Sequence, residues 1–129
     1  MDGQSIDLRC GIAEIVRKLR TGVLTPDDLA EETTERVTRL NPHCRVFVTP
    51  DGAAYDGEPL RRRMRSAAAS PGPLAGMPVA VQDTINTREY PTEWGAADRR
   101  GFTPGNDARL VFSVVQRGGV VAGKANTTG

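Results

Sequence analysis

A short run of polar side chains follows an all-apolar stretch near the middle of this 129-residue chain. The stretch from Pro78 to Val81 is apolar and bounded by turn residues, a pattern that predicts a short buried strand. Gln82 and Asp83 come next, so a carboxamide and a carboxylate stand at the end of that strand. The Gln82 carboxamide can hydrogen-bond but has no proton equilibrium near neutral pH. Asp83 has no second acid beside it, so we expect it to orient neighbouring groups rather than to act in an acid/base pair.

Two further residues carry groups that serve in catalysis elsewhere. Lys124 follows the apolar run Val120 to Ala122, and it would be a base only as a neutral amine with a lowered pKa. The interpretation that we favour is a strand-end lysine paired with a carboxylate or with water. Ser113 falls on a predicted helix, where a surface or packing role is expected rather than that of a nucleophile.

The remaining candidates favour neither a metal site nor a nucleic-acid site. His43 is the single histidine and has no ligand cluster around it, so no metal and no cofactor are predicted. The basic run Arg61 to Arg65 lies on a predicted helix without interleaved aromatics, which indicates a solvated face rather than a surface for nucleic acid. Tyr90 and Trp94 lie in a long loop, where covering a pocket and anchoring the loop are both open interpretations.

The elements that position these residues begin with two helices. Leu8 to Leu19 shows helical apolar spacing, and Gly22 is a suitable stop. A second helix is predicted to start at Thr25-Pro26 and to end at Asn41-Pro42. Together they form an N-terminal helical hairpin.

The rest of the chain alternates strands and helices. A strand is predicted over Arg45–Thr49 with a turn at 50–52, and a third helix over Pro59–Ala69. After a loop from Asp83 to Asn106, Asp107 is predicted to cap a helix that crosses over to the strand at Val120–Ala122. This βαβ unit predicts a right-handed crossover, parallel strands and an α/β fold.

Length and composition support one domain over residues 1–129. Apolar residues make up 38% of the chain and the net charge is +1, which gives no general attraction to nucleic acid or to anionic membranes. Cys10 and Cys44 are predicted to be reduced thiols, with a disulfide between them as the alternative. Neither a membrane span nor a secretory signal is recognised, so we expect a cytoplasmic protein.

Four segments, in order along the chain, resemble motifs of the amidase signature family. The most specific is the block from Gly72 to Asp83, part of the run Gly72 to Asn86 that is similar to the family pattern G-P-L-x-G-I-P-V-x-V-K-D-x-I. The others are Thr25-Pro26, then Asn41-Pro42 with Val46-Phe47-Val48, then Pro104 and Asp107-Ala108 followed by Gly118 to Asn126. The resemblance, to an amidase or an amidotransferase A subunit, implies an α/β fold: a helical hairpin followed by a partial mixed sheet, an incomplete amidase signature fold.

The resemblance also implies hydrolysis of carbon–nitrogen amide bonds by a Ser–cis-Ser–Lys triad. Gln82 stands at the position of the family's catalytic lysine, so the general base is substituted. Both family serines lie downstream of the G-K-T-N stretch, and no residue of this chain matches either of them.

We therefore expect a single partial amidase-like domain that is inactive alone and takes a small amide substrate only if further chain completes it. The alternative is a pseudoenzyme that serves as an accessory module for a protein partner. An active amidase with a different base would require more sequence.

Overall fold

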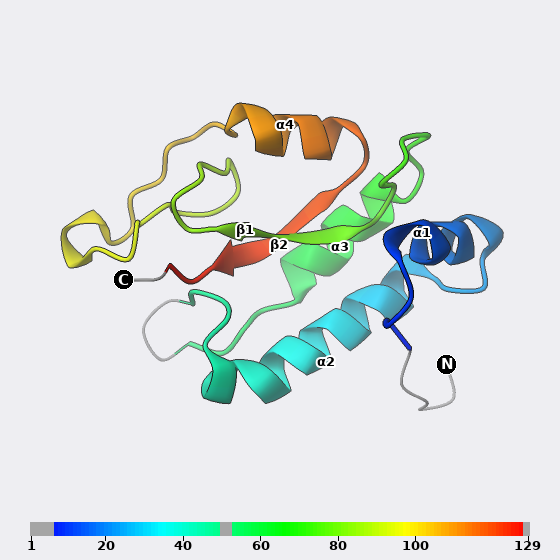
Figure 1. The fold of residues 1–129 in the computed structure, drawn as a ribbon, viewed down its shortest axis with the longest axis horizontal. Helices are drawn as coiled ribbons and strands as arrows, with labels where there is room; N and C mark the ends of the chain where they lie inside the picture. The colour runs from blue at the N-terminus through cyan, green and yellow to red at the C-terminus, as the bar shows by residue number, and fades with distance from the viewer. Residues whose placement is uncertain (1–6, 50–52, 128–129) are drawn as a thin grey trace.

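A computed structural model describes residues 7–49 and 53–127 of the chain. The helices are α1 (Ile12–Thr21), α2 (Pro26–Cys44), α3 (Glu58–Ala67) and α4 (Arg109–Gln116), with a 3₁₀ turn η1 (Ala97–Arg99) and strands β1 (Pro78–Gln82) and β2 (Val120–Ala125). The helix α4 covers one face of the sheet, whereas α3 packs on the other with α2 outside it (Figure 1). The predicted α/β class is confirmed.

The first two helices follow from their capping residues. Gly22 adopts the left-handed conformation (φ 78°) that ends α1, as predicted. Thr25 and Asp28 form a reciprocal capping box at the start of α2, and Pro26 occupies the first turn. The prediction that the first helix begins at Leu8 is wrong, because α1 begins at Ile12 and Leu8 packs against the core from outside it.

The predicted end of α2 at Asn41-Pro42 is also wrong, because the helix continues through Pro42 to Cys44. A proline removes one backbone donor, and here that loss falls in the last turn of a 19-residue helix. The turn is closed by Arg45 N, which donates to Asn41 O at 2.8 Å. The Asn41 side chain also bonds both backbone groups of Phe47, at 2.8 and 3.1 Å, so the exit from the helix is fixed by its own residues.

The two strands are parallel, as the βαβ pattern predicts, and their register contains one irregularity. Val79 pairs with Val121 but Ala80 pairs with Gly123, so Ala122 is an extra residue on β2. This is a β-bulge, which adds twist and leaves one residue out of the ladder. The strand predicted over Arg45–Thr49 is reduced to a single antiparallel bridge from Phe47 to Ala125, and the turn predicted at 50–52 lies outside the described residues.

Two helix ends near the sheet differ from the predictions by a few residues. The helix α3 spans Glu58 to Ala67 rather than Pro59 to Ala69. Asp107 does not cap α4, since the N-cap is Ala108 and no side chain bonds the first turn. The Asp107 carboxylate instead accepts from Arg88 N at 2.6 Å and ties the long loop to the start of α4.

Apolar side chains form one cluster on each face of the sheet. The larger joins α1, α2 and α3 to β2 through Leu29, Leu60 and Met64, all 1% exposed or less. The smaller joins α4 to both strands through Val81, Val111 and Val121. The sheet is therefore the layer that the two clusters share.

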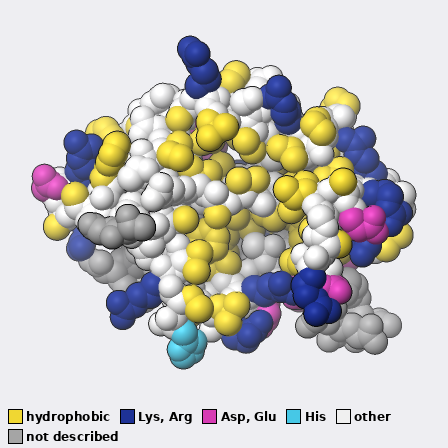
Figure 2. Space-filling model, viewed as in Figure 1, with side chains coloured by type: hydrophobic (Ala, Val, Ile, Leu, Met, Phe, Trp, Pro, Cys, Tyr) yellow, Lys and Arg dark blue, Asp and Glu magenta, His cyan; other side chains and the backbone are white. Residues whose placement is uncertain are grey.

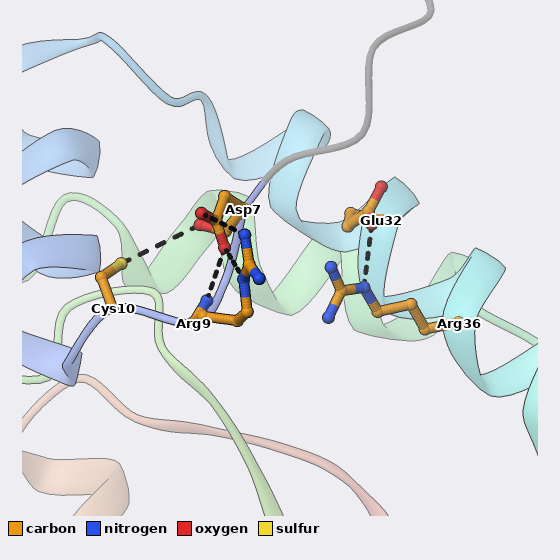
Figure 3. Close-up of polar contacts among 5 residues, drawn as sticks. All are labelled: Asp7, Arg9, Cys10, Glu32 and Arg36. Carbon is orange, nitrogen blue, oxygen red and sulfur yellow. Dashed lines mark hydrogen bonds and ion pairs between the residues drawn. The ribbon is translucent and has the colours of Figure 1, made fainter.

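Both cysteines, and ion pairs between residues close in sequence, lie at the periphery of the fold. Cys10 and Cys44 are both unpaired, as predicted. Figure 3 shows Cys10 Sγ directed at Asp7 O, 3.9 Å away, beside the ion pair of Asp7 with Arg9. No helix within the described ranges is both long and apolar enough to cross a membrane.

A close approach at Gly123 gives the first prediction. A Cβ at Gly123 would lie 2.7 Å from the Phe47 ring, which also packs 5.8 Å from the Tyr55 ring. We expect Gly123→Ala to destabilise the protein by about 1–3 kcal/mol through overpacking, measured by urea unfolding. Phe47→Ala removes the ring atoms that clash, so the double variant should lose less than the sum of the two single losses. Strict additivity would contradict the contact.

Candidate functional site

Gln82 lies exposed at the end of β1, where its register partner on β2 is Ala125. Its side-chain Oε1 is 3.4 Å from Thr84 Oγ1, and its backbone carbonyl accepts from Ile85 N at 3.0 Å. The backbone of Gln82 therefore forms the turn after the strand. The carboxamide points away from the core and can reach a molecule that approaches this end of the sheet.

The next residue has the opposite environment, because Asp83 is 1% exposed and forms an ion pair with Lys124. Asp83 Oδ1 lies 3.2 Å from Lys124 Nζ, and both side chains are buried. Asp83 Oδ2 accepts from Glu93 N at 3.3 Å. The prediction of an orienting Asp83 and of a Lys124 that pairs with a carboxylate matches these contacts.

Lys124 is held by three groups in all. Besides Asp83, its Nζ donates to Thr92 Oγ1 at 2.8 Å and to Pro91 O at 3.2 Å. Burial lowers the pKa of Lys124, while the hydrogen bond and charge of Asp83 act in the opposite direction. An ammonium with three neighbours and 3% exposure is a structural link between β2 and the loop around Thr92.

A second polar network lies where β2 bulges. Arg63 Nη1 donates to Val121 O at 2.9 Å, and its Nη2 donates to the Tyr90 hydroxyl at 2.6 Å. Tyr90 in turn donates to Val121 O at 3.3 Å, and the Tyr55 hydroxyl donates to Ala122 O at 2.6 Å. The carbonyls of Val121 and Ala122, at the bulge, are thus paired by side chains.

The prediction of a solvated basic face on α3 is wrong for Arg63. Arg63 is half-buried in the network at the bulge, and Arg65 forms a bidentate pair with Asp27 at 2.6 Å. Arg62 is exposed, as predicted. The partners of Arg63 lie 27 and 58 residues away in the chain, so spacing within the helix gives no signal of them.

The aromatic residues of this region have different roles. Tyr90 anchors its loop to β2, and its ring lies 5.2 Å from the Arg63 guanidinium. Burial raises the pKa of Tyr55 to about 12. Trp94 is half exposed and lies 5.5 Å from the Arg99 guanidinium, on the outside of the loop.

Two other candidate residues, Ser113 and His43, lie on helices rather than at the ends of the strands. Ser113 lies on α4 and accepts from Arg117, in line with the predicted packing role. His43 is exposed in the last turn of α2. Within residues 7–49 and 53–127, no group of three or more His, Cys, Asp or Glu side chains could hold a metal ion.

Comparison with known proteins identifies the class to which this arrangement belongs. The sequence model of the family described as Amidase matches residues 28–129. Among relatives, the A subunit of the glutamyl-tRNA(Gln) amidotransferase of Chloroflexus aurantiacus is 34% identical over 110 residues, which cover 84% of this chain and 22% of that protein. The chloroplastic/mitochondrial A subunit of the same amidotransferase from Sorghum bicolor is 35% identical over 118 residues, 89% of this chain and 22% of that protein.

Solved structures agree with the sequence comparison. The structure of 6-aminohexanoate cyclic dimer hydrolase with its substrate superimposes with a TM-score of 0.80 at 25% identity, covering 95% of this chain and 24% of the hydrolase. The peptide amidase of Stenotrophomonas maltophilia gives a TM-score of 0.73 at 28% identity, and the match covers 92% of this chain and 25% of the amidase. The chain belongs to the amidase family, and it spans less than a quarter of the length of the two amidotransferase relatives.

The buried pair gives the second prediction. Lys124→Met leaves Asp83 as an uncompensated buried carboxylate, so we expect a loss of about 3–5 kcal/mol in the free energy of unfolding. Arg65→Met removes the exposed pair with Asp27 and should cost no more than about 1 kcal/mol. Urea unfolding of both variants measures the difference.

A double variant separates charge from packing. Replacing Asp83 by Asn in the Lys124→Met background removes the unpaired charge, and part of the lost stability should return. Equal losses for Lys124→Met and Arg65→Met would show that the buried pair does not stabilise the ends of the strands.

Proposed function

We propose that this chain forms the N-terminal region of an amidase-family fold in which position 82 supplies no general base. The observation that carries the proposal is the position of Gln82, exposed at the end of β1 directly before the buried Asp83. The resemblance assigns the triad lysine to this position. A carboxamide here can bind an amide group by hydrogen bonds, but it cannot take a proton from a serine.

Lys124 does not replace the missing base. Its Nζ bonds Thr92 and Pro91 and pairs with Asp83, and the side chain is 3% exposed. A general base must come within hydrogen-bond reach of the proton that it removes. Reaching a substrate from this position would require the lysine to leave all three partners.

The printed names of the relatives indicate what a complete fold of this family does. They include a component of an amidotransferase, a peptide amidase and a hydrolase of a cyclic amide dimer. We infer that a small amide is the substrate class if further chain completes the site. We propose that residues 1–129 alone do not hydrolyse amides, since no residue matches either serine of the resemblance.

A chimera gives the third prediction and tests position 82 in a complete fold. In the chimera, this chain replaces the matching quarter of 6-aminohexanoate cyclic dimer hydrolase. One chimera keeps Gln82, and the other carries Gln82→Lys. We expect Gln82→Lys to hydrolyse the cyclic dimer about 10²–10⁴-fold faster, the usual contribution of a general base. Product formation by chromatography measures the rates, and circular dichroism checks that both chimeras fold.

Two controls sharpen this test. Gln82→Met in the chimera removes the hydrogen-bonding group and should be as slow as Gln82, because neither side chain titrates. The isolated chain with Gln82→Lys should stay inactive on aliphatic and aromatic amides. If Gln82 and Gln82→Lys chimeras hydrolyse the dimer equally fast, position 82 does not carry the base.

An accessory role is the second candidate, and one surface favours it. The helix α4 leaves Leu110, Phe112 and Val115 between 44% and 67% exposed. Figure 2 shows apolar side chains gathered across the upper and central part of this face, with many basic groups nearer its rim. Within the described residues, β1 pairs only with β2, and an edge strand beside an apolar helix is a surface that binds further chain.

The accessory role gives the fourth prediction. The segment of the Stenotrophomonas maltophilia peptide amidase that follows its matched quarter is co-expressed with this chain. We expect a complex on size-exclusion chromatography that Leu110→Asp/Phe112→Asp abolishes. Val23→Asp is the control, since Val23 is 71% exposed at the turn between α1 and α2 and should leave the complex intact. Failure of the unmodified pair to associate would count against the accessory role.

A further inference from the structure

Trp94 is the single tryptophan of the chain, and it lies half exposed beside the end of β1. Its backbone N–H donates to Asp83 O at 2.9 Å, so Trp94 stands next to the strand end that carries Gln82. The segment that bears it runs outward from the sheet into η1, the yellow turn beyond the ends of the strands in Figure 1. Neither apolar cluster of the fold includes Trp94, so packing of the core does not account for this large ring.

The backbone at Trp94 has a conformation that residues with side chains rarely adopt. Its φ is 59°, in the left-handed region, where a side chain is unfavourable. Gly95 follows at φ 70°, and a Cβ there would collide with Thr127 Oγ1. Strained residues of this kind persist only where the surrounding structure fixes them, and they cluster at binding and active sites. The backbone would be better served by glycine at position 94, which indicates that the indole ring itself is used.

The buried ion pair supplies the contacts that fix this segment. Lys124 Nζ bonds Pro91 O at 3.2 Å and Thr92 Oγ1 at 2.8 Å. Asp83 Oδ2 accepts from Glu93 N at 3.3 Å, directly before the tryptophan. A ring whose backbone is held in this way loses little conformational freedom when it binds a ligand, which favours affinity.

The charges near the ring favour a negatively charged ligand. The Arg99 guanidinium lies over one face of the Trp94 ring, 5.5 Å from its centre, which leaves the other face for stacking. Other charged side chains of the segment line a cavity on the side of Phe47, which Trp94 does not line, and these are Glu89, Glu93 and Arg100. Arg88 and Asp98 are exposed and opposite in sign, so Arg99 sets the sign of the charge at the ring.

We propose that Trp94 and Arg99 form a binding site for a small planar aromatic anion such as an aryl carboxylate, whose ring stacks on the free face of the indole and whose charge is attracted by the guanidinium. No bond is formed or broken at this site. Binding requires neither a base at position 82 nor further chain, so the site can be tested separately from the proposed function.

The fifth prediction compares three ligands on the unmodified chain. The ligand 2-naphthoate is planar and anionic, 2-naphthylmethylammonium is planar and cationic, and decalin-2-carboxylate is anionic but not flat. We expect 2-naphthoate to bind with a Kd on the order of 1 mM and each of the others to bind at least about fivefold more weakly, because each lacks either the charge or the stacking surface. The single indole N–H signal in ¹H–¹⁵N spectra reports binding at Trp94 directly.

Variants of Trp94 separate binding from stability. Glycine relieves the left-handed strain, so Trp94→Gly should be at least as stable as the unmodified chain in urea unfolding and should no longer bind 2-naphthoate. Backbone amide signals measure binding in variants that lack the indole. Trp94→Leu should also abolish binding, whereas Phe112→Leu, which replaces a similarly exposed ring on α4, should leave it unchanged.

A second pair of variants tests the charge. Arg99→Gln should bring the affinities for 2-naphthoate and 2-naphthylmethylammonium together, whereas Arg62→Gln, at an exposed position of α3, should not. Equal affinities for the three ligands, binding that survives Trp94→Gly, or no shift of the indole signal would overturn the proposal. A clear loss of stability in Trp94→Gly would also count against it, since the ring would then serve the fold.

Discussion

The ion pair between Asp83 and Lys124 is the constraint on which the centre of this structure depends. Two charges can stay buried only if they meet and are bonded by neighbours, and here they come from strands whose register is set by one extra residue. Because Ala122 bulges, Lys124 rather than Gly123 pairs with Val81. Lys124 then holds the loop at Thr92, so the bulge fixes the loop as well as the strand.

Polar side chains converge on β2 at the position of the bulge. The carbonyls of Val121 and Ala122 accept bonds from Arg63, Tyr90 and Tyr55. Three segments remote in sequence thus supply donors to one irregular position of the strand. The same side chains and the nearby Phe47 line a cavity of about 710 Å³, so the residues that bond the carbonyls at the bulge also shape this cavity.

The sequence predicts elements well where the determinants are local, and it predicts contacts poorly where they are not. The capping box at Thr25, the left-handed Gly22 and the parallel strands follow from nearby residues. The bulge at Ala122 and the burial of Arg63 do not, because they depend on partners tens of residues away. At Pro42 a local rule gives the wrong prediction. The rule that proline ends a helix is outweighed by the bonds that Asn41 makes with Phe47.

The Gln82 side chain takes no part in the buried ion pair, in the bonds at the bulge or in the apolar packing. Its side chain contacts Thr84 alone among the described hydrogen bonds, and neither apolar cluster includes it. A residue that supports no packing can change without loss of the fold, so an intact framework around position 82 says nothing about whether the chemistry is kept. At this end of the sheet the fold depends on Asp83, Lys124 and the bulge beside them, and not on the exposed side chain at position 82.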